Sequence, residues 1–184
     1  MIAPIEGVQI ANYNCPGQIV ISGKTEAVAE AGEKLKEAGA KRVLPLKVSG
    51  PFHSKMLVGA GEKLGKVLDT VEIHTPEIPY IANVTADYVT DAADVKPLLM
   101  KQVSSSVRWE QTIRKMLADG VDTFIEIGPG KTLTGFMRKI DKNAKAFNIE
   151  KLEDIDKVKG AFIAGNQLQL ILGAGTCLLY TSPS

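Results

Sequence analysis

Residues 123–140, TFIEIGPGKTLTGFMRKI, carry the pattern that decides the fold class. The segment 123–127 is rich in β-branched and aromatic side chains, which is typical of a short buried strand. Gly128-Pro129-Gly130 then predicts a tight turn in which glycine supplies a positive φ. From Lys131 to Ile140 the apolar residues recur at helical spacing. A strand that passes through a tight turn into a helix is the repeating unit of an α/β fold.

The same alternation extends toward both ends of the chain. The segments that we expect to be extended are 7–14, 18–22, 42–48, 71–73, 78–84 and 146–149. The segments that we expect to be helical are 26–38, 54–69, 92–102 and 109–119. Thr25 is expected to cap the first helix, and Pro45 indicates an edge position or a bulge in its strand. We therefore predict an α/β fold with a largely parallel sheet, which begins with a β-α-β arrangement.

Composition and charge exclude several classes of protein. The chain has 184 residues, of which 45% are hydrophobic and 23% charged, and 22 basic residues nearly balance 21 acidic ones. This balance does not favour binding to nucleic acid or to an anionic membrane. No apolar run reaches the roughly 18 residues that a membrane-spanning helix needs. Two cysteines, Cys15 and Cys177, form neither a disulfide framework nor a zinc quartet, so we expect a reducing, cytoplasmic location.

His53 is the first candidate for a chemical role. It lies in the loop Ser49-Gly50-Pro51-Phe52-His53-Ser54, directly after a predicted strand, where α/β enzymes usually place catalytic groups. A neutral imidazole is the natural general base near neutral pH. The alternative is a histidine that caps or packs at the start of the following helix. His74 lies between charged neighbours in V-E-I-H-T and is expected to be a surface residue.

The sequence contains no clear nucleophile to accompany His53. No G-x-S-x-G occurs in the 184 residues, so the serine turn of α/β hydrolases is absent. Cys15 is better explained as a buried structural cysteine, and Ser104-Ser105-Ser106 as a helix cap. Gly128-Pro129-Gly130-Lys131 lacks the spacing of a phosphate-binding loop, and no His, Cys, Asp or Glu cluster has metal-ligand spacing. We therefore expect no cofactor and no metal.

Five strings in combination resemble one family. They are NYNCPGQIVISG (12–23), AGAKRVLPLKVSGPFHS (38–54), PYIANVTAD (79–87), LLMKQVSSSVRWEQTI (98–113) and FIEIGPGKTLTGFMRKI (124–140). Together they resemble the C-terminal half of bacterial malonyl-CoA:acyl carrier protein transacylases, over about residues 5–160. The resemblance implies part of an α/β-hydrolase-like acyltransferase core at 49–160. It also implies part of a ferredoxin-like small subdomain at 1–48.

The resemblance further implies an activity and a set of site residues. The family transfers a malonyl group from malonyl-CoA to the phosphopantetheine thiol of acyl carrier protein through an acyl-serine ester. His53 matches the family's catalytic base, and Gln102 matches the residue whose backbone carbonyl orients that base. Phe52 matches the phenylalanine of malonyl-selective acyltransferases, whose ring leaves no room for an α-methyl branch. Further substrate-binding positions are matched by Asn12, Asn14, Gln18 and Asn83.

Other parts of the family's machinery have no match in this sequence. The nucleophilic serine in its G-H-S-x-G turn, the oxyanion-hole residues and the arginine that pairs with the malonyl carboxylate precede the matching segment in the family. We therefore expect the chain to be a fragment that is inactive alone. Residues 161–184 are expected to be an artefactual tail, because CLLYTSPS (177–184) resembles a translated sequencing adapter.

Two alternatives stay open at this point. One is the acyltransferase domain of a polyketide synthase, which flanking domains would distinguish. The other is a non-catalytic fragment that binds a carrier protein through basic residues, namely Lys131, Arg138, Lys139 and Lys142. For the complete enzyme we expect a monomer whose partners are malonyl-CoA and acyl carrier protein, with no nucleic acid and no membrane.

Overall fold

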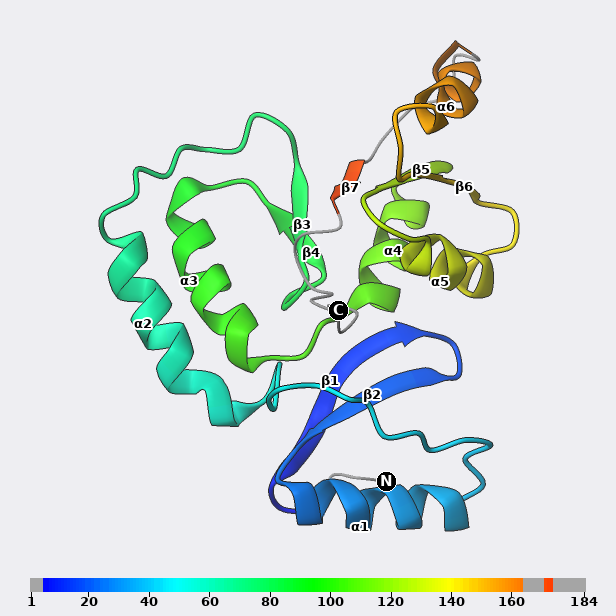
Figure 1. Cartoon of the computed structure of the whole chain (residues 1–184). Coiled ribbons are helices and arrows are strands. Elements are labelled where there is room, and N and C mark those ends of the chain that lie inside the picture. The colour runs from blue at the N-terminus through cyan, green and yellow to red at the C-terminus, as the bar shows by residue number, and fades with distance from the viewer. Residues whose placement is uncertain (1–4, 164–170, 174–184) are drawn as a thin grey trace. The chain divides into compact units, whose positions relative to one another are not determined.

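The computed structural model describes residues 5–163 and 171–173, which contain both helices and strands (Figure 1). The chain divides into two compact units. Among the described residues, the first unit contains those up to Tyr13 together with Gln18–Arg108, and the second contains Asn14–Gly17 and those from Trp109 onward. Where one structural domain ends and the next begins in the complete protein stays a prediction.

A β-hairpin and a helix begin the chain. β1 (Val8–Cys15) pairs with β2 (Gln18–Gly23), and the two connecting residues end in Gly17 with a φ of 76°. A connection of two residues joins only antiparallel strands. α1 (Thr25–Glu37) follows, and its Ala27 and Ala31 form a small apolar cluster with Ile5, Val8 and Ile21.

Two of the expectations for this region are wrong. Thr25 is the first residue of α1, and Lys24 before it makes no side-chain capping bond. The segment 42–48 is not a strand, and its Leu44, Leu46 and Val48 are exposed. A strand pattern forms a strand only where a neighbouring strand supplies partners for its backbone groups, and no described strand pairs with this segment. The expected β-α-β arrangement is therefore two strands and a helix, followed by an irregular segment.

Two packed helices and a second hairpin complete the first unit. The short helix η1 (Lys55–Leu57) precedes α2 (Val58–Leu68), which packs against α3 (Ala92–Ser104). Glycine allows this close approach, because a Cβ on Gly61 would lie 2.6 Å from the carbonyl oxygen of Met100. β3 (Tyr80–Ala82) and β4 (Asp87–Val89) pair antiparallel and pack against α3. The Asp91 side chain caps α3, accepting a hydrogen bond from the Ala93 N–H at 2.8 Å.

The second unit contains a parallel sheet, in agreement with the expected α/β pattern. β5 (Thr123–Ile127) lies between β6 (Lys145–Ile149) and β7 (Ile171–Gly173) and pairs parallel with both. The helices of this unit are α4 (Trp109–Ala118), α5 (Thr132–Ile140) and α6 (Asp154–Ile163). β7 falls within the stretch expected to be an artefactual tail, and the origin of that stretch stays a prediction.

A buried carboxylate organises the turn between β5 and α5. Glu126 is 4% exposed, and its Oε1 accepts a hydrogen bond from the Leu133 N–H at 3.1 Å. Its Oε2 accepts hydrogen bonds from the N–H and the Oγ1 of Thr134, at 2.8 and 2.7 Å. The first N–H groups of a helix have no partner within the helix, and negative charge is favourable at that end. Glu126 therefore joins the strand to the helix that follows it.

We predict that Glu126→Ala lowers the stability of the second unit. The substitution leaves the buried N–H groups of Leu133 and Thr134 without their acceptor and leaves the Thr134 hydroxyl only the long contact with the Phe147 carbonyl, which costs roughly 2–4 kcal/mol. Urea denaturation of the chain measures the change. Glu110→Ala is the control, since it removes only a helix-surface pair with Arg114 and is expected to cost less than about 0.5 kcal/mol. Equal losses in the two variants would contradict the assigned role.

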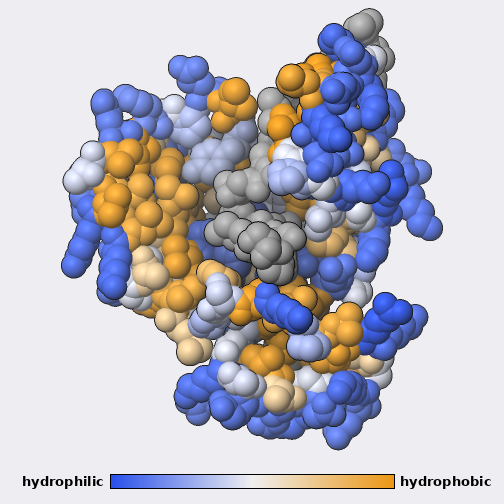
Figure 2. All heavy atoms as spheres, in the orientation of Figure 1, coloured by the Kyte–Doolittle hydropathy of each residue, from blue (hydrophilic) through white to orange (hydrophobic). Residues whose placement is uncertain are grey.

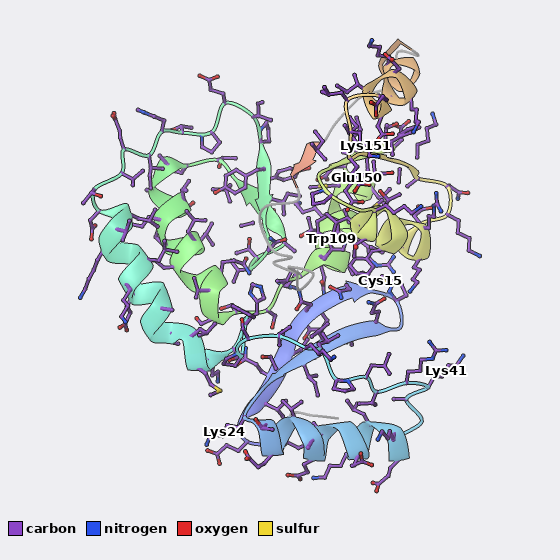
Figure 3. All side chains as sticks on the ribbon, in the orientation of Figure 1. Cys15, Lys24, Lys41, Trp109, Glu150 and Lys151 are labelled. Carbon is purple, nitrogen blue, oxygen red and sulfur yellow. The ribbon has the colours of Figure 1, made fainter. Side chains whose placement is uncertain are left out.

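A second carboxylate holds the start of α6. Asp154 Oδ2 accepts hydrogen bonds from the N–H groups of Glu150 and Lys151, at 3.1 and 3.0 Å. Its Oδ1 accepts a hydrogen bond from Lys157 Nζ at 2.5 Å. Figure 3 labels Glu150 and Lys151 in the segment that leads from β6 to α6. The lysine and these N–H groups lower the pKa of Asp154 from 3.8 to about 2.

This lowered pKa predicts a local transition in acid. The pKa of Asp154 is lower in the folded chain, so its contribution to local stability is present above about pH 4. That contribution is lost as the pH falls through about 2, because protonation removes the charge that these donors stabilise. Hydrogen exchange at Glu150 and Lys151 should therefore lose protection over this range. Asp154→Asn should lose the protection at every pH, whereas Asp156→Asn, which removes a surface pair with Lys159, should keep it.

Candidate active site

The His53 ring lies against the end of α3 in the first unit. Its Nδ1 is 3.1 Å from the carbonyl oxygen of Gln102. A carbonyl oxygen only accepts hydrogen bonds, so Nδ1 carries the hydrogen and donates it. In a neutral imidazole the lone pair then belongs to Nε2. The arrangement provides a general base whose tautomer is set by a backbone carbonyl.

The position of Gln102 explains why its carbonyl accepts a bond from a side chain. α3 ends at Ser104, so Gln102 belongs to the last turn of the helix. The last four carbonyls of a helix have no partner four residues ahead. The Ser105 N–H donates to the Gln102 carbonyl only at 3.5 Å. The helix end therefore provides an acceptor that the imidazole can use.

The backbone of His53 is left-handed, with a φ of 56°. This conformation is unfavourable for a residue other than glycine, so surrounding contacts must hold it. The neighbouring Ser54 is buried, donates a hydrogen bond to the Pro51 carbonyl at 2.7 Å and accepts one from the Met56 N–H at 3.3 Å. Ser54 is the residue that caps η1, so the alternative of a capping histidine is wrong.

Gln9 also contacts this loop, although it is not among the residues predicted from the sequence. Its Nε2 donates a hydrogen bond to the His53 carbonyl at 2.9 Å, and its Oε1 accepts one from the Lys55 N–H at 2.9 Å. Gln9 is 44 residues away from His53 in the sequence. No local pattern in the strand VQIANYNC indicates such a contact.

Asn12 and Asn83, two predicted binding residues, lie beside the segment that follows α3. The Val107 N–H donates to the Ala11 carbonyl at 2.8 Å, and the Val107 carbonyl accepts from the Tyr13 N–H at 2.9 Å. These two bonds flank Asn12 in β1, where its side chain is buried. The Arg108 N–H donates to the Asn83 carbonyl at 2.9 Å. The backbone therefore brings Asn12 and Asn83 to one segment.

The remaining predicted binding residues are Phe52, Gln18 and Asn14. Phe52 directly precedes His53 and is 40% exposed. Gln18 is half-buried at the start of β2. Asn14 is buried and belongs to the second unit. The binding roles of these residues stay predictions.

Several secondary expectations have clear outcomes. The His74 side chain is 77% exposed, which confirms it as a surface residue. Cys15 is buried in the second unit, and burial raises the pKa of its thiol, which agrees with a structural role. Of the three serines after the predicted helix, Ser105 is the C-terminal cap of α3, and the Ser106 hydroxyl donates to the Ile10 carbonyl.

An open groove lies elsewhere in the first unit. It has a volume of about 660 Å³ and lies between α2 and α3, with Val58, Pro97 and Met100 in its lining. Figure 2 shows apolar atoms gathered over these two helices. His53 is not among the lining residues. Among the described residues, no helix is long and apolar enough to cross a membrane, and no cluster of side chains is suited to hold a metal ion.

Several known proteins are similar to this chain in sequence and structure. A curated relative from Bacillus subtilis, named malonyl CoA-acyl carrier protein transacylase, is 51% identical over 149 residues, which are 81% of this chain and 47% of the relative. The crystal structure of an acyl carrier protein S-malonyltransferase from Vibrio cholerae is 42% identical with a TM-score of 0.82, over 85% of this chain and 51% of that one. A malonyl transacylase in complex with a type II polyketide synthase acyl carrier protein is 36% identical with a TM-score of 0.81, over 86% of this chain and 52% of that one.

These matches identify the fold and the family. The chain spans about half the length of the curated relatives and solved structures that it matches. It has the fold of the corresponding part of the malonyltransferases, with contributions to an α/β-hydrolase-like core and to a ferredoxin-like subdomain. The sequence model of a family described as "Acyl transferase domain" matches residues 1–166. Because this match covers most of the 184 residues, the chain belongs to the acyl transferase domain family.

Proposed function

We propose that this chain supplies the general base of an enzyme that transfers a malonyl group from malonyl-CoA to the phosphopantetheine thiol of an acyl carrier protein. The observation that carries the proposal is the 3.1 Å contact between His53 Nδ1 and the Gln102 carbonyl. Relatives that are 42–51% identical and named malonyl CoA-acyl carrier protein transacylases support this reaction. The relative solved with an acyl carrier protein supports the acceptor.

In the first half-reaction, Nε2 of His53 accepts the proton of a serine hydroxyl while the serine oxygen attacks the thioester carbonyl of malonyl-CoA. The carbon–sulfur bond then breaks, and the imidazolium returns the proton to the sulfur of coenzyme A. An acyl-serine ester remains. The 184 residues contain no G-x-S-x-G, so the complete enzyme must supply this serine from outside them.

In the second half-reaction, His53 accepts the proton of the phosphopantetheine thiol. The thiolate attacks the ester carbonyl, and the serine oxygen leaves with the proton from His53. In both steps the Gln102 carbonyl keeps the hydrogen on Nδ1, so Nε2 alternates between base and acid. The carbonyl dipole also stabilises the transient imidazolium without adding a full negative charge.

Substrate contacts are proposed for four polar residues. Asn12, Asn14, Gln18 and Asn83 are the proposed contacts to the acyl-CoA, and the burial of Asn12 and Asn14 supports a role other than surface solvation. Phe52 is proposed to exclude branched acyl groups. The complete enzyme is proposed to be a cytoplasmic monomer. It is also proposed to have no nucleic-acid or membrane partner, and the near balance of 22 basic and 21 acidic residues in this chain supports that part of the proposal.

The proposal predicts that His53→Ala in a complete enzyme containing this segment lowers malonyl transfer at least about a hundredfold, because a general base is lost. Transfer from malonyl-CoA to purified acyl carrier protein measures the rate. His74→Ala is the matched control, since His74 is the other histidine and is exposed. Gln102→Ala should cost much less than His53→Ala, because a backbone carbonyl survives a change of side chain. Transfer at the parent rate in His53→Ala would refute the proposal.

Phe52 is predicted to control which acyl group is accepted. Its replacement by alanine in the complete enzyme should raise the ratio of methylmalonyl to malonyl transfer by roughly tenfold, which is the usual effect of one methyl group in a pocket. Competition between the two acyl-CoA substrates measures this ratio. Phe147→Ala in β6 is the comparison for the loss of a phenylalanine elsewhere in the chain. An unchanged ratio in Phe52→Ala would remove Phe52 from the selectivity argument.

A further inference from the structure

We propose that Gln9 is a positioning residue for His53, and that strand β1 sets the distance between His53 and the Gln102 carbonyl. This inference rests on the proposed function for its meaning in catalysis. The hydrogen bonds from which it is argued all lie within the first unit. It assigns a role to a side chain that contacts the backbone of the base and takes no part in the reaction itself.

The first observation is the pair of hydrogen bonds that Gln9 makes with the His53 loop. A primary amide donates through its nitrogen and accepts through its oxygen, and the two groups are held in one plane. Gln9 uses the nitrogen for the His53 carbonyl and the oxygen for the Lys55 N–H, both at 2.9 Å. One side chain therefore connects the backbone on both sides of Ser54, next to the left-handed φ of 56° at His53.

The second observation concerns the next residues of the same strand. The Ile10 carbonyl accepts a hydrogen bond from the Ser106 hydroxyl, and the Ala11 carbonyl accepts one from the Val107 N–H at 2.8 Å. Ser106 is only four residues beyond Gln102. Three consecutive residues of β1, 9–11, thus contact both the His53 loop and the segment that directly follows α3. Because a strand rises about 3.3 Å per residue and resists stretching, it acts as a spacer between the two.

Losing Gln9 should therefore act on the imidazole through the backbone. Without the amide, the His53 carbonyl and the Lys55 N–H lose the two hydrogen bonds that Gln9 makes with them. The loop can then relax from its left-handed conformation, because that conformation needs support from surrounding contacts. The ring moves away from the Gln102 carbonyl, and the tautomer with hydrogen on Nδ1 loses its preference.

The test compares three variants of the 184-residue chain. Gln9→Ala removes both bonds, and Gln9→Glu keeps the acceptor for Lys55 but loses the donor to His53. Ala31→Gly is the control, because it destabilises the same unit at a fully buried site of α1 outside this loop. Nitrogen-15 NMR of the His53 ring at alkaline pH, where imidazoles are neutral, reports the tautomer. Hydrogen exchange of the Lys55 amide reports the acceptor bond.

We expect the parent chain and Ala31→Gly to keep hydrogen on Nδ1. The Nδ1–H fraction should fall about twofold or more in Gln9→Ala and Gln9→Glu, because both lose the bond to the His53 carbonyl. The exchange rate of the Lys55 amide should rise about tenfold in Gln9→Ala but stay near the parent value in Gln9→Glu. An unchanged tautomer in Gln9→Ala, or the same tautomer change in Ala31→Gly, would overturn the proposal.

Activity separates this inference from the proposed function. In a complete enzyme, Gln9→Ala should lower kcat about tenfold with little change in KM, as expected for a misplaced base. A loss of transfer without a tautomer change would refute the positioning role and leave the function intact. A tautomer change in Gln9→Ala, combined with full activity of His53→Ala, would refute the function and leave the positioning role intact.

Discussion

The hydrogen bond between His53 Nδ1 and the Gln102 carbonyl requires a backbone conformation that histidine disfavours. With a φ of 56°, the chain turns sharply at His53 and directs the ring to the end of α3. This conformation persists because Ser54 and Gln9 satisfy the backbone groups around it. The candidate site is therefore a strained turn held by side chains from a strand and a short helix, as is common where a group must be oriented.

Both units use the unpaired backbone groups at a helix end, but for different purposes. At the C-terminal end of α3, the Gln102 carbonyl accepts a bond from the imidazole and sets its tautomer. At the N-terminal end of α5, buried Glu126 accepts bonds from two N–H groups and attaches the helix to β5. The first use serves the proposed chemistry, and the second serves stability. In each case a single side chain provides the partner that the helix itself lacks.

Local patterns were sufficient for elements whose partners lie nearby in the sequence. The strand, turn and helix over 123–140 formed as expected, because apolar periodicity, two glycines with positive φ and a glutamate cap act within a few residues of one another. The prediction of a strand over 42–48 is wrong for the opposite reason, because its partners do not lie nearby in the sequence. Its apolar alternation is that of a strand, yet a strand needs a second strand at its edge, and no described residues fill that place. The predicted cap at Thr25 is wrong by a single residue, because the sequence specifies helix ends only weakly.

The sequence by itself determined that the chain contains both helices and strands, that His53 occupies a loop, and that a nucleophilic serine turn is absent from the 184 residues. It also carried the resemblance that pointed to Gln102. Only the tertiary structure decided that His53 is left-handed, that its Nδ1 meets a carbonyl 49 residues away, and that Gln9 supports its loop. The physical reason is that backbone carbonyls, and the N–H groups of all residues except proline, do not differ from one residue type to another. These backbone groups can serve a site only where the fold leaves them unpaired. No local pattern of side chains predicts where that happens.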